Sequence, residues 1–180
     1  MSSSDAVAVG DAGATVDPDA LVAELFTDQA RSLVRLAGFF CDDRNAAEDL
    51  VQEAFIRLHR TAGSIKNPTR APAFLRSIVI NLARDHNRRG LMSLRHRSSL
   101  DQPRTTPSFE DEAVHGEDDR AVLRALRQLP DRQRSCLVLR YYMELSESET
   151  AETLGISKSS VKTHCRRGLS ALETALEERP

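Results

Sequence analysis

The stretch LSESETAETLGISKSSVKTHCRR, residues 145–167, determines the fold expected for the C-terminal part of the chain. Ser146 and Glu149 have the spacing of a capping box, which opens a helix. Gly155 then breaks that helix, and Ser157 caps a final helix that continues to about Glu177. Two short helical runs joined by a glycine turn predict a helix-turn-helix.

The residues within and around the turn are those that this geometry needs. Ala151 is small where the two helices cross, and Ile156 and Val161 are expected to point inward and fix the angle between them. The outward side of the second helix carries charges for phosphates together with hydroxyl and guanidinium groups able to reach base edges. These candidate DNA contacts are Lys158, Ser159, Lys162, Thr163, Arg166 and Arg167.

A helical hairpin with a solvated basic face is the alternative interpretation of this stretch. The turn glycine, the small crossing residue, the cap and the basic face coincide here, and their coincidence favours DNA binding. His164 stands where an apolar residue is common. It fits either the edge of the core or a phosphate contact, and the sequence does not decide between them.

Upstream of this motif the same domain begins near Arg120 and continues to the C-terminus, so the predicted range is 120–180. The residues Val122, Leu123, Leu126 and Leu129 mark one helix, which Pro130 ends. A second helix is expected from Arg132 to Met143.

Two segments lack the pattern of a folded core. Residues 98–119 contain Pro103, Pro107, Gly116 and an acidic cluster, which predicts a flexible linker between domains. Residues 1–18 are rich in Ser, Ala, Gly and Asp with little periodicity, which predicts a disordered tail.

Residues 19–97 form the other predicted domain, with apolar residues recurring at helical spacing. Helices are expected over 21–40, 46–60 and 73–89, and the last of them is expected to bury its apolar side chains. Those side chains are Phe74, Leu75, Ile78, Val79 and Leu82. Ala, Leu, Arg and Glu dominate the composition and β-branched runs are rare, so the predicted fold class is all-α: two small helical domains joined by a linker.

The third predicted helix carries a polar stripe opposite its apolar one. Ser77, Asn81, Arg84 and Arg88 repeat at intervals of four, three and four, and such a face suits a nucleic-acid groove. A LuxR-type response regulator would carry a similar helix-turn-helix. Its receiver domain would show alternating strands and helices, and this domain shows no such alternation.

Composition and charge exclude several other functions. The net charge is −2, but basic residues gather around residues 76–97 and 158–167, where a phosphate backbone would meet them. No stretch approaches the roughly 20 apolar residues that cross a bilayer, so a cytoplasmic protein without membrane insertion is expected. Cys41, Cys136 and Cys165 lack the spacing of a zinc site and are expected to be reduced thiols.

An enzyme would need a nucleophile with its base, a metal cluster or a phosphate loop. The carboxylates at Asp42, Asp43, Glu48 and Asp49 lie at the predicted entrance of a helix and match no acid/base constellation. We therefore expect no catalysis, no cofactor and no metal.

Three segments together resemble the extracytoplasmic-function (ECF) group of the sigma-70-type RNA polymerase sigma factors. They are AEDLVQEAFIRLHR (47–60), AFLRSIVINLARDHNRR (73–89) and LPDRQRSCLVLRYYMELSESETAETLGISKSSVKTHCRRGLSAL (129–172), in the family's order. The resemblance implies a non-enzymatic subunit that brings core RNA polymerase to promoters, reads the −35 and −10 elements and helps open the −10 region.

The resemblance also implies a role for each segment. Asp49, Gln52 and Glu53 would dock on the clamp helices of the largest polymerase subunit, although acidic residues here could simply favour the positive N-terminus of their own helix. The second domain would read the −35 element and meet the flap of the second-largest subunit. An anti-sigma factor is an expected further partner.

The −10 element would be read by the third helix and opened with the help of the loop before it. The helix residues are Ser77, Asn81, Arg84, Asp85, Arg88 and Arg89, and the loop residues are Ser64, Ile65, Lys66, Asn67, Pro68, Thr69 and Arg70. Many members of the family carry Trp where this chain has Phe74, and this loop has no aromatic residue. We therefore expect the loop to hold an extruded base in a pocket formed by backbone atoms, and not on an aromatic stacking surface.

Overall fold

The computed structural model describes residues 17–41, 43–96 and 116–178, and within them every regular element is a helix. The prediction of an all-helical protein is therefore confirmed. The elements, in chain order, are α1 (Pro18–Gly38), α2 (Arg44–Ala62), the 3₁₀ helix η1 (Pro68–Arg70), α3 (Ala71–His96), α5 (Glu117–Gln128), α6 (Asp131–Leu137), the π-helical segment η2 (Val138–Tyr142), α7 (Glu147–Leu154) and α8 (Lys158–Glu177).

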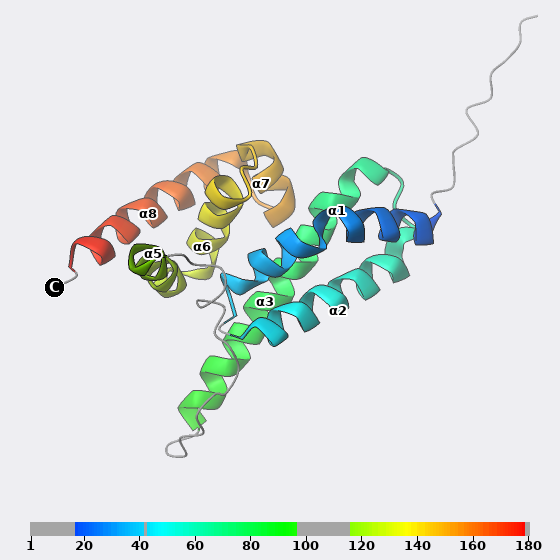
Figure 1. The fold of residues 1–180 in the computed structure, drawn as a ribbon. Coiled ribbons are helices and arrows are strands. Elements are labelled where there is room, and N and C mark those ends of the chain that lie inside the picture. The colour runs from blue at the N-terminus through cyan, green and yellow to red at the C-terminus, as the bar shows by residue number, and fades with distance from the viewer. Residues whose placement is uncertain (1–16, 42, 97–115, 179–180) are drawn as a thin grey trace, which may run out of the picture.

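Helices α1, α2 and α3 form a bundle that we call the N-terminal module (Figure 1). Its largest fully buried side chains come from all three helices: Leu33, Leu36, Leu58, Leu75 and Ile80. The prediction that Phe74 is buried is wrong, because its side chain is 40% exposed. Ile80 and Ala83, which complete the apolar side of α3, take the interior positions instead.

Several predicted boundaries shift by a few residues. The first helix begins at Pro18, with Asp17 accepting a 3.1 Å hydrogen bond from the amide of Asp19, so the tail expected over residues 1–18 ends earlier. α3 begins at Ala71, because Pro72 lies in the first turn, where a helix needs no amide donor. The remaining residues expected in the tail, 1–16, lie outside the described part of the chain.

The predicted linker is also shorter at its C-terminal end. Glu117, Asp118 and Asp119 form the first turn of α5, where carboxylates are stabilised by the positive end of the helix. The rest of that segment, residues 98–115, lies outside the described residues.

Helices α5 to α8, with η2, form the C-terminal module around Leu126, Leu129, Leu137 and Val161. The prediction of a single helix from Arg132 to Met143 is wrong for its second half, because residues Val138–Tyr142 form the π-helical segment η2. A π-helical turn inserts an extra residue into the helical repeat and changes the direction in which the following side chains point. Val138 and Leu139, which lie in this segment, are both buried.

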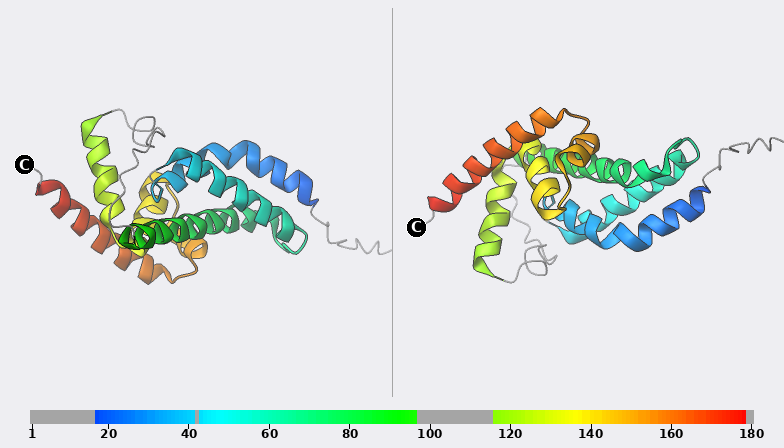
Figure 2. Two further views of the ribbon diagram at one scale, coloured as in Figure 1. Left: turned by 90° about the horizontal axis from the view of Figure 1, so that it is seen from below. Right: turned by 90° about the horizontal axis from the view of Figure 1, so that it is seen from above.

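The two modules pack against each other, with α7 lying beside α3 (Figures 1 and 2). Val138 and Leu139 of the C-terminal module belong to the same apolar cluster as the interior of the N-terminal module. The rings of Phe39 and Tyr142 meet edge to face with centroids 4.6 Å apart. The interface therefore has an apolar centre as well as polar contacts.

Candidate nucleic-acid interface

The turn between α7 and α8 is held by backbone geometry and by caps on both helices. Ser146 and Glu149 form a reciprocal capping box, with bonds of 2.8 and 3.2 Å. Gly155 ends α7 in the left-handed region with φ 62°, a conformation that glycine adopts without a steric penalty. The hydroxyl of Ser157 accepts a 3.1 Å bond from the amide of Ser160 at the start of α8. Each of these residues plays the part expected from the sequence.

The inner side of α8 lies very close to α6. Val161 is fully buried and Cys165 nearly so, as expected of the face that fixes the angle of the helix. A Cβ atom on Gly168 would lie 2.9 Å from Cδ1 of Leu137, so this glycine permits the close approach. Sequence analysis missed Gly168. A glycine inside a strongly periodic helix was the signal that could have found it.

The outer side of α8 brings the predicted −35 residues together on one surface. Lys158, Ser159, Lys162, Arg166 and Arg167 are exposed, and Thr163 is half-buried. Lys162 lies 3.6 Å from a carboxylate oxygen of Glu147, but its side chain is 67% exposed and available to a phosphate. His164 is partly buried, so the structure leaves its role open.

On α3 the predicted −10 residues also share one surface, but the C-terminal module partly covers it. Asn81, Arg88 and Arg89 are exposed, whereas Ser77, Arg84 and Asp85 are half-buried. Nε of Arg84 lies 3.7 Å from a carboxylate oxygen of Asp131, and the side chain of Arg84 is only 22% exposed. Arg88 donates a 3.0 Å hydrogen bond to Asp85. This surface is called the α3 face below.

The loop expected to help open the −10 element is short and internally bonded. The side-chain oxygen of Asn67 accepts hydrogen bonds from the amide and the hydroxyl of Thr69, at 3.0 and 2.6 Å. Ile65 anchors the loop by packing against the N-terminal core, while Ser64, Lys66 and Pro68 are exposed. Arg70 forms a 2.8 Å ion pair with Glu152 of α7.

The candidate polymerase contacts lie on α2. Asp49 and Gln52 are exposed, and Glu53 accepts a 2.7 Å hydrogen bond from Arg57. None of the three lies in the first turn of α2, which contains no acidic residue. Because the dipole effect falls off within the first turn, it does not account for their presence.

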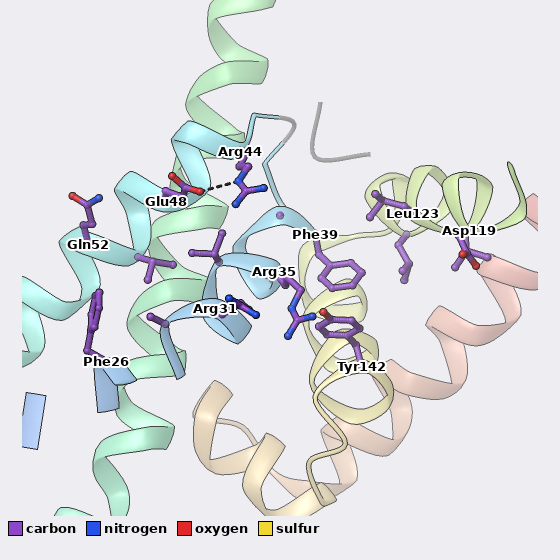
Figure 3. A pocket seen from close by; sticks show the side chains of 16 residues that line it. Phe26, Arg31, Arg35, Phe39, Arg44, Glu48, Gln52, Asp119, Leu123 and Tyr142 are labelled. Atoms are coloured by element: carbon purple, nitrogen blue, oxygen red, sulfur yellow. Dashed lines mark hydrogen bonds and ion pairs between the residues drawn. The ribbon is translucent and has the colours of Figure 1, made fainter. Parts of the chain in front are cut away.

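Gln52 also lines a pocket of about 930 Å³ between α1, α2 and α5 (Figure 3). Arg31 and Arg35 of α1 project into it, and the rings of Phe39 and Tyr142 meet edge to face at its side. Leu123 of α5 contributes to the opposite wall. The pocket therefore spans both modules and adjoins the candidate polymerase surface.

The cysteines show no sign of chemical activation. All three are buried. Burial raises the pKa of Cys136 to about 12, and burial also raises the pKa of its neighbour Cys165. Both are therefore protonated thiols at neutral pH. Among the described residues, no group of His, Cys, Asp and Glu is arranged to hold a metal ion, and no helix is long and apolar enough to cross a membrane.

Sequence analysis also missed the arginines that join or brace the modules. Arg127 donates 3.0 Å hydrogen bonds to the carbonyl oxygens of Gly38 and Cys41. Arg134 is buried, donates to the carbonyls of Arg127 and Leu129, and lies over the ring of Phe40. The carbonyl partners of Arg127 and the aromatic partner of Arg134 are distant in the sequence, so nothing in the local pattern distinguishes these residues from surface arginines.

Comparison with known proteins accounts for both modules. Residues 25–90 match the family model described as Sigma-70 region 2, and residues 119–172 match the model described as Sigma-70, region 4. The match to Sigma-70 region 2 is not expected of a LuxR-type regulator, so that alternative is set aside.

The chain is 32% identical over 149 residues to an RNA polymerase sigma-E factor of Streptomyces avermitilis, a match that spans 82% of this chain and 80% of that one. It is 30% identical over 161 residues to the ECF RNA polymerase sigma factor SigM of Mycobacterium tuberculosis, spanning 85% and 76% of the two chains.

Among solved structures, the fold is similar to that of the sigma factor RpoE in complex with the anti-sigma factor NepR from Bartonella quintana. The TM-score is 0.65 at 19% identity, over 88% of this chain and 98% of that one. The chain belongs to the extracytoplasmic-function group of the sigma-70 family, the non-enzymatic subunits with which core RNA polymerase recognises promoter DNA.

Proposed function

We propose a division of the sigma-factor activity among three helices of this chain. The outer side of α8 reads the −35 element, the α3 face with the loop at residues 64–70 reads and opens the −10 element, and α2 docks on the clamp helices of the largest polymerase subunit. The C-terminal module meets the flap of the second-largest subunit. The observation that carries this proposal is that the helical residues assigned to each role share one surface of their helix.

The α8 surface suits a duplex. Its exposed lysines and arginines provide charge for phosphates, while the neighbouring hydroxyls of Ser159 and Thr163 are short and can approach base edges. The hydroxyl group of Thr163 donates a 3.0 Å hydrogen bond to the carbonyl of Ser159, and its oxygen can still accept one.

The α3 face suits an opening duplex for a different reason. Extruding a base costs a few kcal/mol, and the protein must return part of that energy through contacts with the exposed strand. Asn81 offers an amide that can pair with a base edge, and Arg88 and Arg89 offer charge to the backbone beside it.

The proposed function also indicates the cellular location of the protein and a further partner. A protein that binds core RNA polymerase works in the bacterial cytoplasm, so we place the chain there. Two similar structures are complexes with the anti-sigma factor NepR and with the cytosolic domain of CnrY, which supports an anti-sigma factor as a further partner of this chain.

The polymerase surface is tested by reversing charge on α2. We expect the double variant Asp49→Arg, Glu53→Arg to bind core polymerase at least about tenfold more weakly, a loss of about 1.4 kcal/mol, because two attractive contacts become repulsive. Both positions lie on the outside of the helix, so circular dichroism should show unchanged helical content.

A matched control reverses two other exposed acidic residues, Glu24→Arg and Asp28→Arg on α1. This control has the same change in net charge and should keep its core affinity. If the α2 variant bound core as tightly as the control, the assignment of this surface would be wrong.

A further inference from the structure

The pocket between α1, α2 and α5 has the size and the lining of a small-molecule site (Figure 3). Its volume is about 930 Å³, which lies within the range of roughly 300–1,000 Å³ that is typical of ligand sites. Its apolar wall includes Phe39 of the N-terminal module and Leu123, Leu126 and Tyr142 of the C-terminal module. Ligand sites occur preferentially where two such units meet.

Two arginines of α1 bring positive charge into this pocket. Arg31 and Arg35 are one helical turn apart and exposed, and both guanidinium groups lie in the open space of the pocket (Figure 3). In the described part of the chain neither of them is paired with a carboxylate. Like charges four residues apart destabilise a helix slightly. An anion held between the two groups would remove that repulsion and accept charge-assisted hydrogen bonds.

The acidic residues of the lining do not neutralise this pair. Glu48 already accepts a 2.8 Å hydrogen bond from Arg44. Asp119 lies on α5, on the other side of the pocket from α1 (Figure 3). Three arginines against two carboxylates leave the lining with one net positive charge. The pocket therefore favours an anion over a neutral molecule or a cation.

The volume of the pocket favours a small molecule over a segment of another protein. A helix about 10 Å in diameter fills roughly 420 Å³ in each turn, so about two turns would fill the pocket. Two turns bury far less than the roughly 800 Å² per partner of a stable protein interface. A compact organic molecule can instead place most of its surface against the pocket.

We propose that this pocket binds an organic anion with one charged head group and an apolar body. Arg31 and Arg35 hold the head group, a carboxylate or a phosphate, through charge-assisted hydrogen bonds. The body lies against Leu123 and the edge-to-face pair of Phe39 and Tyr142, whose ring centroids are 4.6 Å apart. Such a ligand contacts both modules at once. None of these five residues is assigned to promoter DNA or to core polymerase.

The first test uses the full chain and anilinonaphthalene sulfonate, an aromatic anion that fluoresces in apolar sites. We expect saturable binding to the parent and at least about tenfold weaker binding to Arg31→Gln, Arg35→Gln, because charge-assisted hydrogen bonds are lost. The matched control is Arg57→Gln, Arg60→Gln, which removes the same charge from exposed positions of α2 outside the pocket lining. Circular dichroism should show the parent's helical content in both double variants.

Competition then separates the contribution of the head group from that of the body. Decanoate should displace the probe, and decanol, which has the same chain without the charge, should need an at least about tenfold higher concentration. Adenosine monophosphate offers a phosphate head group on an aromatic body. The stronger competitor of decanoate and adenosine monophosphate identifies whether an acyl or an aromatic body fits the pocket.

Three results would overturn the proposal. Equal binding of the probe to Arg31→Gln, Arg35→Gln and to the control would show that these arginines do not hold the anion. Equal displacement by decanoate and decanol would show that the pocket recognises only an apolar body. If the probe does not bind saturably, or if neither anion displaces it below about 1 mM, the pocket is a surface for a protein partner and not a small-molecule site.

Discussion

The two helices that are proposed to bind promoter DNA, α8 and α3, differ in how much of their surface the rest of the chain covers. On α8 the assigned residues project from the outside of the C-terminal module, and the ion pair between Lys162 and Glu147 is long and exposed. On α3 the assigned residues meet Asp131 and the end of α7, so half of them are partly covered. The proposed DNA surface of α8 is therefore exposed in this structure, and the proposed DNA surface of α3 is partly covered.

The difference follows from how each surface is built. α8 is positioned by a cap, a left-handed glycine and close packing on α6, all within one short module. The apolar side of α3 packs in the core of the N-terminal module, and its polar side contacts a module that is distant in the sequence. Local changes in the C-terminal module should therefore affect the two surfaces in opposite directions.

The largest of these effects is expected at Gly168. Gly168→Ala places a Cβ atom 2.9 Å from Leu137, so α8 must move away from α6 or Leu137 must adopt a poorer rotamer. Such overpacking costs about 1–3 kcal/mol, to which the better helix propensity of alanine returns less than about 1 kcal/mol. We expect a lower free energy of unfolding in urea and weaker binding to duplex DNA.

The control for this variant is Gly63→Ala at the end of α2. A Cβ atom there meets nothing within 4 Å, and the residue has φ −64°, which alanine adopts freely. Its stability should stay unchanged or rise slightly. A Gly168→Ala protein as stable as this control would show that α8 is not held by close contact with α6.

A smaller effect is expected at Ser146, which caps the helix lying between the two DNA surfaces. Ser146→Ala removes one half of the capping box and should cost about 1 kcal/mol of stability in the C-terminal module. Because α7 both supports α8 and covers the α3 face, the variant should lose duplex binding while hydrogen exchange on α3 becomes faster. Unchanged exchange on α3 would indicate that α7 does not protect it.

The smallest expected effect is a pH dependence. Hydrogen bonds from Ser146 hold the pKa of Glu149 below its ordinary value of 4.5, so the folded protein favours the carboxylate. The stability that this provides is present above the ordinary value and is lost as the pH falls through the lowered pKa. The free energy of unfolding should therefore decline as the pH falls below 4.5 and through the lowered pKa, and less steeply in Glu149→Gln. Equal slopes for the parent and the variant would contradict a role for this carboxylate.

The sequence predicted the parts of this architecture that depend on local pattern. The capping box at Ser146, the turn at Gly155 and the amphipathic helices of the N-terminal module are all encoded by residues within a few positions of one another. The π-helical turn after Leu137 was missed. Its residues Val138 and Leu139 are buried in a cluster shared with the N-terminal module, and contacts between residues so distant in the sequence leave no local pattern.

The covering of the α3 face was missed for the same reason. Arg127 and Gly38, or Arg70 and Glu152, are each some 80 to 90 residues apart in the chain, and no periodicity connects such positions. The residues of the candidate site were therefore identifiable from the sequence, but their accessibility was not.

The measurement that tests the division between the two DNA surfaces most directly is abortive transcription by the holoenzyme, on duplex promoters and on the same promoters mismatched across the −10 region. Asn81→Ala and Arg84→Ala should impair initiation on the duplex more than on the premelted template, because premelting removes the cost of unpairing. Lys162→Ala and Arg166→Ala should lose about 1–3 kcal/mol for each base contact and be impaired on both templates alike. If premelted DNA rescued the α8 variants and failed to rescue the α3 variants, the two surfaces would be assigned the wrong way round.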